Sequence, residues 1–273
     1  MPYVVFIFFV KWRIDMDVDS VIHAAAEAGR IILENGGETY RVEDTILRIC
    51  NAFNIKDADS YVTPTGIILS AADEYEQTVS LVVRIKCRTV NLEKIALVND
   101  VSRNIKTKGY TLEQLRDELK KIDTMKKYKN STLIISSGFG SGFFAFLFGG
   151  NLYDFAISFA AGCIIKQLSI ILSKININDF FIYIVGGMTA ALSALISVQI
   201  FPFSCHLDKI IIGSIMILVP GLAITNAIRD TISGDLVSGI SRAAEAFLIA
   251  VAVAAGTGIV LKFWFTFSGG AIH

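Results

Sequence analysis

The amino-acid sequence predicts an α-helical membrane protein with five transmembrane helices, preceded by a small cytoplasmic α+β domain. The first observation is a division of charge. Residues 1–130 hold 19 of the 25 Lys and Arg residues and 19 of the 25 Asp and Glu residues, so residues 131–273 hold six of each. The second observation is a series of five long apolar runs in the second half, and the third is a group of lysines just before the first run. The first half therefore has the composition of a soluble domain, and the second half that of a membrane domain.

We expect three segments along the chain. Residues 1–16 form an N-terminal extension of unknown role, because their apolar stretch is too short to span a bilayer and, unlike a signal peptide, has its basic residues after it. Residues 17–130 form the cytoplasmic α+β domain, and residues 131–273 form the transmembrane domain. Neither half carries a net charge, which argues against nucleic acid as a partner.

The soluble half is expected to fold in the order α-α-β-β-α-α. The expected helices cover residues 21–35, 40–53, 92–108 and 112–126, and the expected strands cover residues 61–71 and 78–87. Pro64 lies inside the first strand and indicates an edge or bulged strand, because proline cannot donate a ladder hydrogen bond. The acidic link Asp73–Glu76 would join the two strands as a hairpin.

Two local signals mark the boundary between the last two helices of this half. Gly109 is expected to end the third helix, since glycine adopts the left-handed C-terminal turn without strain. Thr111 and Gln114 have the spacing of a capping box, which predicts the start of the fourth helix.

Each of the five apolar runs is long enough to cross a membrane. They cover residues 132–150, 152–173, 180–201, 210–228 and 243–263. A helix rises about 1.5 Å per residue, so about 20 residues cross an apolar core of about 30 Å. The fourth run contains a Pro-Gly pair, and it either spans the membrane or re-enters.

Basic residues set the expected orientation of the helices. The lysines before the first run are Lys120, Lys121, Lys126, Lys127 and Lys129. Loops rich in Lys and Arg stay in the cytoplasm, so the α+β domain should be cytoplasmic. The link Asn151–Asp154 then lies outside, and five crossings also place the C-terminus outside.

Polar residues gather around the junction of the last two runs and indicate a transport site. The candidates for a substrate or proton pathway are Pro220, Gly221, Asn226, Arg229, Asp230, Asp235, Arg242 and Glu245. Proline lacks a backbone N–H, so the helix must kink or open at Pro220 and free a carbonyl for a ligand. A charge at the bilayer centre costs about 2.5–3.5 kcal/mol, which favours a function for the charges kept here. Arg242 and Glu245 lie three residues apart and can pair on one helical face.

Structural interpretations of these residues stay open. The kink can serve packing alone, and the charges from Arg229 to Asp235 can lie in a cytoplasmic loop or an interfacial helix. A second polar group, in the soluble half, consists of Arg30, Glu38, Arg41, Glu43 and Asp44. It could gate a transport path or dock a partner, or it could be an ion-paired corner between two helices.

The chain offers little for catalysis. Raw material for a membrane-anchored hydrolase consists of His23, Ser70, Asp73 and Cys87, but there is no Gly-x-Ser-x-Gly elbow and no His-Glu-x-x-His motif. The four cysteines match no zinc or redox spacing. We therefore expect no enzymatic activity, no cofactor and no metal. A membrane scaffold that only assembles other proteins is a further alternative.

Two stretches together resemble the threonine/serine exporter family of inner-membrane proteins. The first is GGETYRVEDTILRIC (36–50) with YVTPTGIILS (61–70), and the second is PGLAITNAIRDTISGDLVSGISRAAEA (220–246). The resemblance runs in order from about residue 20 to residue 263. It implies a multi-pass protein of the bacterial cytoplasmic (inner) membrane that exports threonine and serine, or small dicarboxylates. It also implies coupling to an ion gradient, for which we expect the proton gradient.

The resemblance further implies a companion subunit. Full-length members carry about ten membrane helices, in keeping with two related halves, whereas five are expected here. This chain would be the larger subunit of a split exporter, beside a small all-membrane companion. Arg229 or Arg242 would then hold the substrate carboxylate, because guanidinium forms paired hydrogen bonds with it. Asn226 would bind a hydroxyl. The substrate ammonium or a coupling proton would be held by one of three carboxylates, Asp230, Asp235 or Glu245.

Overall fold

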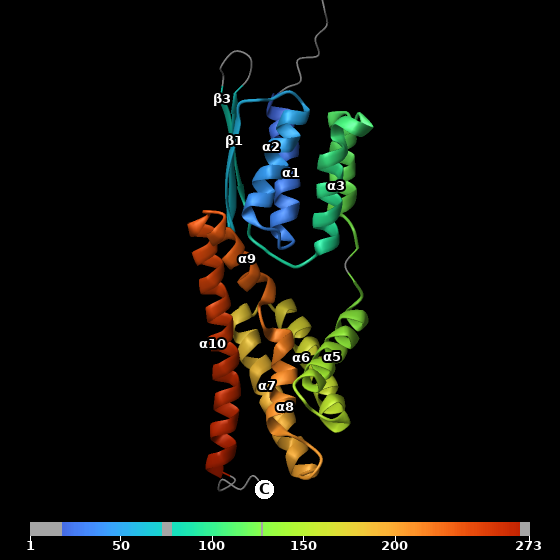
Figure 1. Ribbon diagram of the computed structural model, residues 1–273, viewed down its shortest axis with the longest axis vertical. Helices are drawn as coiled ribbons and strands as arrows, with labels where there is room; N and C mark the ends of the chain where they lie inside the picture. The colour runs from blue at the N-terminus through green and yellow to red at the C-terminus, as the bar shows by residue number, and fades with distance from the viewer. Residues whose placement is uncertain (1–17, 73–77, 127, 268–273) are drawn as a thin grey trace, which may run out of the picture. The chain divides into compact units, whose positions relative to one another are not determined.

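The computed structural model describes residues 18–72, 78–126 and 128–267 (Figure 1). The chain divides into two compact units, residues 1–125 (unit 1) and residues 126–273 (unit 2). The expected N-terminal extension, residues 1–16, and the expected acidic link Asp73–Glu76 lie outside the described residues. Each unit has buried apolar clusters of its own.

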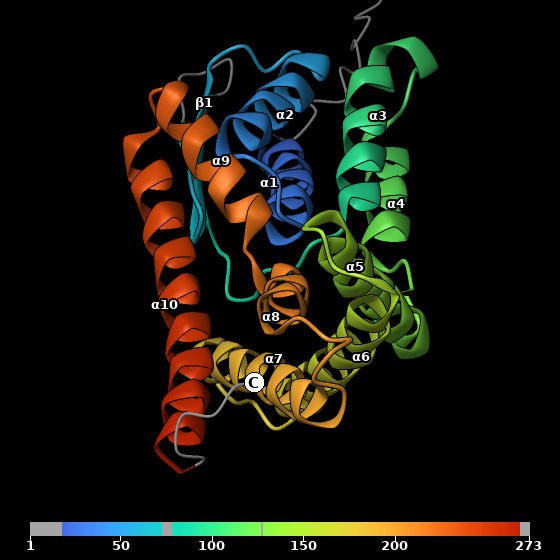
Figure 2. The ribbon, with the colours of Figure 1, turned by 60° about the horizontal axis from the view of Figure 1, so that its bottom comes forward.

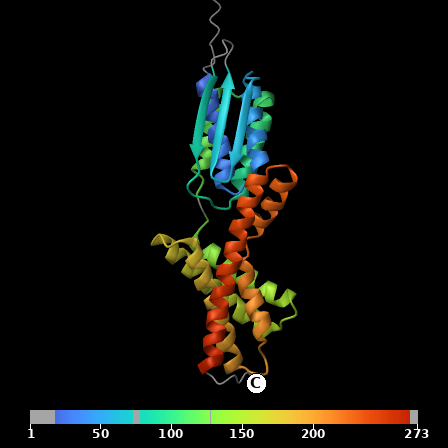
Figure 3. The ribbon, with the colours of Figure 1, turned by 90° about the vertical axis from the view of Figure 1, so that its left-hand side faces the viewer.

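Unit 1 consists of four helices and a sheet in three layers. Its elements are α1 (Val18–Glu34), α2 (Thr39–Ala52), β1 (Ala58–Thr63), β2 (Gly66–Ala72), β3 (Thr78–Arg84), α3 (Leu92–Lys108) and α4 (Leu112–Asp123). The strands form an antiparallel sheet in the order β1-β2-β3. α1 and α2 cover one face of this sheet, and α3 and α4 pack against α1. Figure 3 shows the sheet in front of these helices.

The core of unit 1 follows from the apolar spacing of its elements. Ile32 of α1 and Ile46 of α2 are fully buried, as are Ile67 and Leu69 on alternate positions of β2. The helices turn one apolar stripe toward the sheet, and the sheet turns every second residue toward the helices. Full burial of one such side chain contributes about 1.5–3 kcal/mol, so the core holds the three layers together.

Both local signals between α3 and α4 are confirmed. Gly109 follows α3 with a left-handed backbone, at a φ of 63°. Thr111 caps α4 reciprocally: its Oγ1 accepts from Gln114 N at 3.3 Å, and its own N donates to Gln114 Oε1 at 3.0 Å.

The first expected strand is wrong, because residues 58–72 form two strands. β1 and β2 pair with Thr63 opposite Gly66, so Pro64 and Thr65 make the two-residue turn between them. The fixed φ of proline suits a turn, and its missing N–H removes no ladder bond there. The order is therefore α-α-β-β-β-α-α. The last strand also ends earlier than expected, and Cys87 beyond it is exposed.

Unit 2 is helical over its described residues. Its elements are α5 (Asn130–Leu147), α6 (Leu152–Lys174), α7 (Asp179–Ile200), α8 (Leu207–Ile215), the short 3-10 helix η1 (Met216–Leu218), α9 (Gly221–Ile232) and α10 (Leu236–Phe267). Figure 2 shows α10 along one side of the unit and α5 with α6 along the other. α8 packs against α5, α6 and α7, and α10 packs against α7 and α9.

Among the described residues, three helices are long and apolar enough to cross a membrane, namely α6, α7 and α10. α8 with η1 and α9 form a fourth candidate, bent by 59°, which is a broken span or a re-entrant loop. The expected count of five exceeds this number. The first expected span forms α5, whose 18 residues include several Ser and Gly, and α5 is not among the helices long and apolar enough to cross.

The expected polar link between the last two spans is mostly helical. α9 continues to Ile232, and α10 begins at Leu236, well before the expected start at residue 243. Gly234, with a φ of 96°, makes the turn between the two helices. At about 1.5 Å per residue, the 32 residues of α10 extend about 48 Å. This exceeds an apolar core of about 30 Å, so α10 is longer than a simple span requires.

Two glycines of α10 provide a matched test of its packing on α7. A Cβ at Gly256 would collide with the carbonyl oxygen of Ile184, whereas a Cβ at Gly258 would meet nothing within 4 Å. We expect Gly256→Ala to lower the stability of the protein by about 1–3 kcal/mol through overpacking. Gly258→Ala should raise it by about 0.5–1 kcal/mol, because alanine is the better helix former. Thermal unfolding in detergent would measure both changes, and equal shifts would contradict the packing described.

Candidate functional site

The helix break in unit 2 occurs at Pro220. This residue cannot donate to the preceding turn, and Gly221 N donates to Val219 O at 2.9 Å. Leu218, just before the break, is buried against Gly186 of α7, where a Cβ would lie 2.8 Å from the leucine methyl. Close packing therefore holds the break at a defined place against α7.

Beyond the break, α9 and α10 form a hairpin around a buried ion pair. Nε of Arg242 lies 3.0 Å from Oδ2 of Asp230, and the two side chains are 5% and 0% exposed. Asn226 lies one turn before Asp230 on the buried face of α9, and Ser238 lies one turn before Arg242 on the buried face of α10. Polar residues of both helices thus lie on the buried faces of the hairpin.

The close approach of the two helices depends on Gly239. A Cβ at this position would collide with Thr231 Oγ1 and lie 3.0 Å from Ala227 O. Thr231 Oγ1 itself donates to Ala227 O at 2.7 Å, so this hydroxyl is bonded within its own helix. At the turn, Asp235 N donates to Asp230 O at 2.9 Å. The local sequence therefore brings Asp230 and Arg242 within reach across the hairpin.

Burial determines what this pair can do chemically. Removing an ion from water costs several kcal/mol, and the partner charge offsets this only while both remain in place. A ligand that carries a carboxylate can replace Asp230 beside Arg242, since guanidinium binds carboxylates in a planar fork. An ammonium or a proton can in turn neutralise Asp230. The pair is therefore suited to exchange with small zwitterions and acids.

The other residues expected at this site occupy different environments. Arg229 is exposed on α9, Asp235 is half-buried at the turn, and Glu245 is half-buried one turn after Arg242. The sequence suggested that Arg242 can pair with Glu245, and the structure shows an ion pair of Arg242 with Asp230. Of the two arginines considered, Arg242 is the one that lies inside the hairpin.

In unit 1, Arg30 bridges two helices. Its guanidinium lies 2.6 Å from Glu27, 2.6 Å from Glu34 and 2.8 Å from Asp123, which joins α1 to the end of α4. The hydrogen bond to Glu27 is the largest influence and raises the pKa of Arg30 above its usual range. Lys94 of α3 adds a bond from its Nζ to Asp123 O at 2.7 Å. This network ties the helical layers of unit 1 together.

The remaining residues of the expected gating group lie on or beside α2. Arg41 Nε lies 2.7 Å from Glu38 Oε2, at the start of the helix. Glu43 accepts a hydrogen bond from the backbone N of Val62 in β1 at 2.9 Å, and Asp44 pairs with Arg48. These contacts tie α2 to itself and to the sheet, whereas the contacts of Arg30 join α1 to α4, so the ion pairs of Arg30 are made with residues outside this expected group.

Two polar features of unit 2 were not singled out by sequence reasoning. Asp154 is fully buried and accepts from His206 Nδ1 at 2.8 Å, although 52 residues separate them. The capping spacing of Asn151 and Asp154 is visible in the sequence, but the partner histidine is not. The second feature is Lys166, which lies half-buried in α6, about 4.5 Å along the axis from the helix midpoint.

The described residues offer little for metal or enzymatic chemistry. No group of three or more His, Cys, Asp and Glu side chains among them could hold a metal ion. His23 contacts the backbone of Asp19 on its own helix, and Ser70 contacts Ser80 across the sheet. These contacts do not bring a nucleophile to a base.

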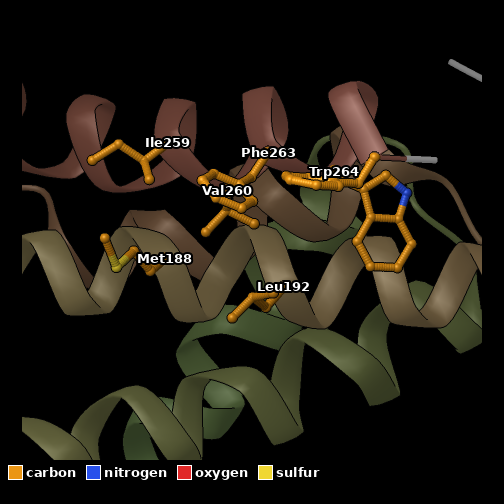
Figure 4. Close-up of a pocket in the computed structure, with 7 residues that line it drawn as sticks. Met188, Leu192, Ile259, Val260, Phe263 and Trp264 are labelled. Atoms are coloured by element: carbon orange, nitrogen blue, oxygen red, sulfur yellow. The ribbon is translucent and has the colours of Figure 1, made fainter. Parts of the chain in front are cut away.

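A cavity of about 620 Å³ lies between α7 and α10 (Figure 4). Its lining residues are Met188, Leu192, Ile259, Val260, Phe263, Trp264 and Phe267. No charged residue lines it, so it is not suited to a small hydrophilic ligand.

Comparison with known proteins identifies a transport family. The family model of threonine/serine exporters, ThrE, matches residues 23–264. The chain is similar to the threonine/serine exporter of Corynebacterium glutamicum, with 24% identity over 90% of this chain and 51% of that protein. It is also similar to a protein of Klebsiella aerogenes named as a probable succinate transporter subunit, YjjP, with 20% identity over 90% of this chain and 94% of that protein. No solved structure matches the chain.

The relatives differ in length. The chain spans about half the length of the curated threonine/serine exporters that it matches, including one named as probable from Mycobacterium tuberculosis, of which it covers 47%. It spans nearly the whole length of the proteins named as transporter subunits, with 95% coverage of that from Escherichia coli.

The buried ion pair should show strong energetic coupling. We expect Asp230→Ala or Arg242→Ala to lower stability by about 3–5 kcal/mol each, because each leaves a buried charge without its partner. The double variant should lose less than the sum, with a coupling of up to about 3 kcal/mol. Thermal unfolding in detergent would measure the cycle. Arg229→Ala serves as the control and should stay within about 0.5 kcal/mol. Additive losses would show that the pair is not coupled.

Proposed function

Because the chain belongs to the threonine/serine exporter family, we propose that it is the larger subunit of a split secondary exporter of small carboxylate metabolites. The family is one of membrane exporters and not of enzymes, and the long apolar helices make this a multi-pass membrane protein. The relatives are named for threonine and serine or for succinate. All three compounds carry a carboxylate and are small and hydrophilic, which defines the proposed substrate class.

The observation that carries this proposal is the buried Asp230–Arg242 pair in the apolar unit. In the resting site the two side chains neutralise each other at 3.0 Å. A substrate carboxylate would replace Asp230 beside Arg242, because a guanidinium is a planar carboxylate receptor. The freed Asp230 would hold the substrate ammonium or a proton, and Asn226 would bind a hydroxyl. Glu245, half-buried one turn further along α10, is the next candidate for the proton.

Three further parts of the proposal concern the assembly. α5 would be a fifth transmembrane helix, and the helices that surround it in the membrane would cover its less apolar faces. The companion subunit is supported by the names of relatives of similar length, which are called transporter subunits. Arg30, Glu38, Arg41, Glu43 and Asp44 would stiffen the cytoplasmic unit, which would gate the path or dock the companion. The proton gradient would drive export, as the resemblance to a secondary transporter implies.

Substrate flux tests the role of the pair. We expect Arg242→Gln and Asp230→Asn to lower efflux of threonine, serine or succinate by roughly tenfold or more, since a charge-assisted hydrogen bond contributes about 1.5–3 kcal/mol. Arg242→Lys keeps the charge without the planar fork and should recover part of the flux. Radiolabelled substrate in membrane vesicles from cells that carry each variant would measure this.

The matched control for this test is Arg229→Gln, which removes an exposed arginine of the same hairpin. It should retain efflux within about twofold. If Arg229→Gln abolishes efflux while Arg242→Gln leaves it intact, the assignment of the carboxylate site to the ion pair is wrong.

The orientation has a separate test. Basic residues before α5 predict that unit 1 is cytoplasmic and that the loop after α7 is outside. Cys87 of unit 1 is exposed, and Phe203 in the loop is fully exposed. A membrane-impermeant maleimide should label Phe203→Cys in intact cells, but label Cys87 only after permeabilisation. The reverse pattern would invert the proposed topology.

A further inference from the structure

The ends of α6 and α8 meet at a buried carboxylate that lies far along the chain from the helix hairpin. Asp154 is 0% exposed, whereas the side chain of its partner His206 is 53% exposed. Oδ2 of Asp154 contacts His206 Nδ1 at 2.8 Å and accepts from Asn151 N at 2.9 Å. Oδ1 accepts from His206 N at 2.7 Å. The imidazole therefore connects a buried carboxylate directly to the surface of the unit.

The surrounding loops hold this geometry in place. Asn151 accepts from Asp154 N at 3.0 Å and donates from Nδ2 to Ser204 O at 2.6 Å. The loop before α6 is thus bonded to the loop before α8. At Gly150, a Cβ would lie 2.8 Å from Ala145 O and 3.0 Å from the Asp154 side chain. The carboxylate is enclosed on this side, and His206 is its exposed neighbour.

Buried hydroxyls continue inward from the carboxylate. Ser158, one turn further along α6, donates to Ile210 O of α8 at 3.5 Å. Ser214 lies one turn beyond Ile210 on α8, and Ser141 of α5 packs against the backbone of α6. All three serines are fully buried, and among the described residues Ser141 and Ser214 have no hydrogen-bond partner. Hydroxyl groups both donate and accept, so α5, α6 and α8 each carry a buried polar group beyond Asp154.

Among the described residues, His206 is the ion-pair partner recorded for Asp154, and the lysines of α6, Lys166 and Lys174, lie three or more turns further along that helix. Asp208 and Lys209, in the first turn of α8, pair with each other at 2.9 Å. α5 contains no charged residue, and the one charge of α7, Asp179, lies at the opposite end of that helix. The neighbouring titratable groups are Tyr153, which is exposed, and Cys205, which is buried beside the histidine.

We propose that Asp154 is a proton-binding site of the exporter, loaded from the surface through His206. Histidine gains and loses protons in the physiological pH range. The half-exposed imidazole accepts a proton from water on Nε2 and donates the proton on Nδ1 to Oδ2 of Asp154. The net change is one proton moved from water to a buried carboxylate, with His206 returned to its neutral form. The protonated carboxyl can then act as a hydrogen-bond donor as well as an acceptor.

This inference rests on the proposed function, because it assigns the entry point of the coupling proton. The orientation expected from the basic residues places the loop before α6 on the outside. An exporter driven by the proton gradient takes its proton from that side. The proton site and the substrate site would then be separate, since Asp154 lies in the α5–α6–α8 part of unit 2 and the ion pair lies in the α9–α10 hairpin.

The test compares two modes of transport in vesicles from cells that carry the full chain with its native membrane partners. Downhill exchange of labelled for unlabelled substrate needs the substrate site alone. Export against a concentration gradient, driven by an imposed pH gradient, also needs the proton site. We expect Asp154→Asn to lower driven export at least tenfold and to leave exchange within about twofold, because an amide keeps acceptor capacity but carries no proton. Asp208→Asn is the matched control, and it should retain both modes.

A second variant tests the proposal even if Asp154→Asn does not fold. His206→Gln keeps the backbone bond from His206 N to Asp154, and its side chain is exposed, so the fold should survive. We expect it to shift the pH profile of driven export without altering exchange. Two results would overturn the proposal: a normal rate and pH profile of driven export in both variants, or an equal loss of exchange and driven export. Either result would mean that the Asp154–His206 contact only holds the two loops together. Absence of flux in the unmodified protein would instead refute the proposed function itself.

Discussion

The organisation of unit 2 depends on the cost of burying Asp230 and Arg242. Burying either charge alone in an apolar unit would cost several kcal/mol. The partner charge offsets this cost only when the two side chains lie opposite each other across the hairpin. This arrangement requires α9 and α10 to approach closely, which Gly239 permits, and to reverse direction sharply, which Gly234 permits. The break at Pro220 then turns α9 away from the axis of α8. The electrostatic requirement thus accounts for the hairpin and its two glycines, whereas the missing N–H of Pro220 accounts for the bend before them.

The sequence predicts local features of this protein well because their causes are local. The capping box at Thr111 and the end of α3 at Gly109 depend on residues within one turn, and both are confirmed. Pro64 was assigned to an edge or bulged strand. Proline is equally compatible with such a strand and with a turn, so the residue type alone does not decide between them. Only the pairing of Thr63 with Gly66 decides between the two. The sequence left the polar link before α10 open between a loop and a helix, and the structure makes most of it helical.

The candidate site could be predicted only in part, because some of its features are local in the sequence and others depend on contacts between distant residues. Asp230 and Arg242 stand out as charges in an apolar context, but their mutual contact depends on the hairpin geometry. Asp154 and His206 could not be matched from sequence, because 52 residues separate them and neither is unusual near a helix end. The group around Glu38 was expected to act as one cluster that included Arg30. The structure instead joins Arg30 to Asp123 at the far end of unit 1's sequence, a contact that no periodicity reveals.

The uninterrupted length of α10 has a mechanical consequence. The helix carries Arg242 near its start and continues without a break to Phe267, so it behaves as one stiff rod of about 48 Å. A tilt of about 5° at the ion-pair end would displace the far end by about 4 Å. Opening the pair would therefore also displace the far end of α10, with little deformation in between. Rigid-body rocking of this kind is how alternating access is achieved around a fixed binding site.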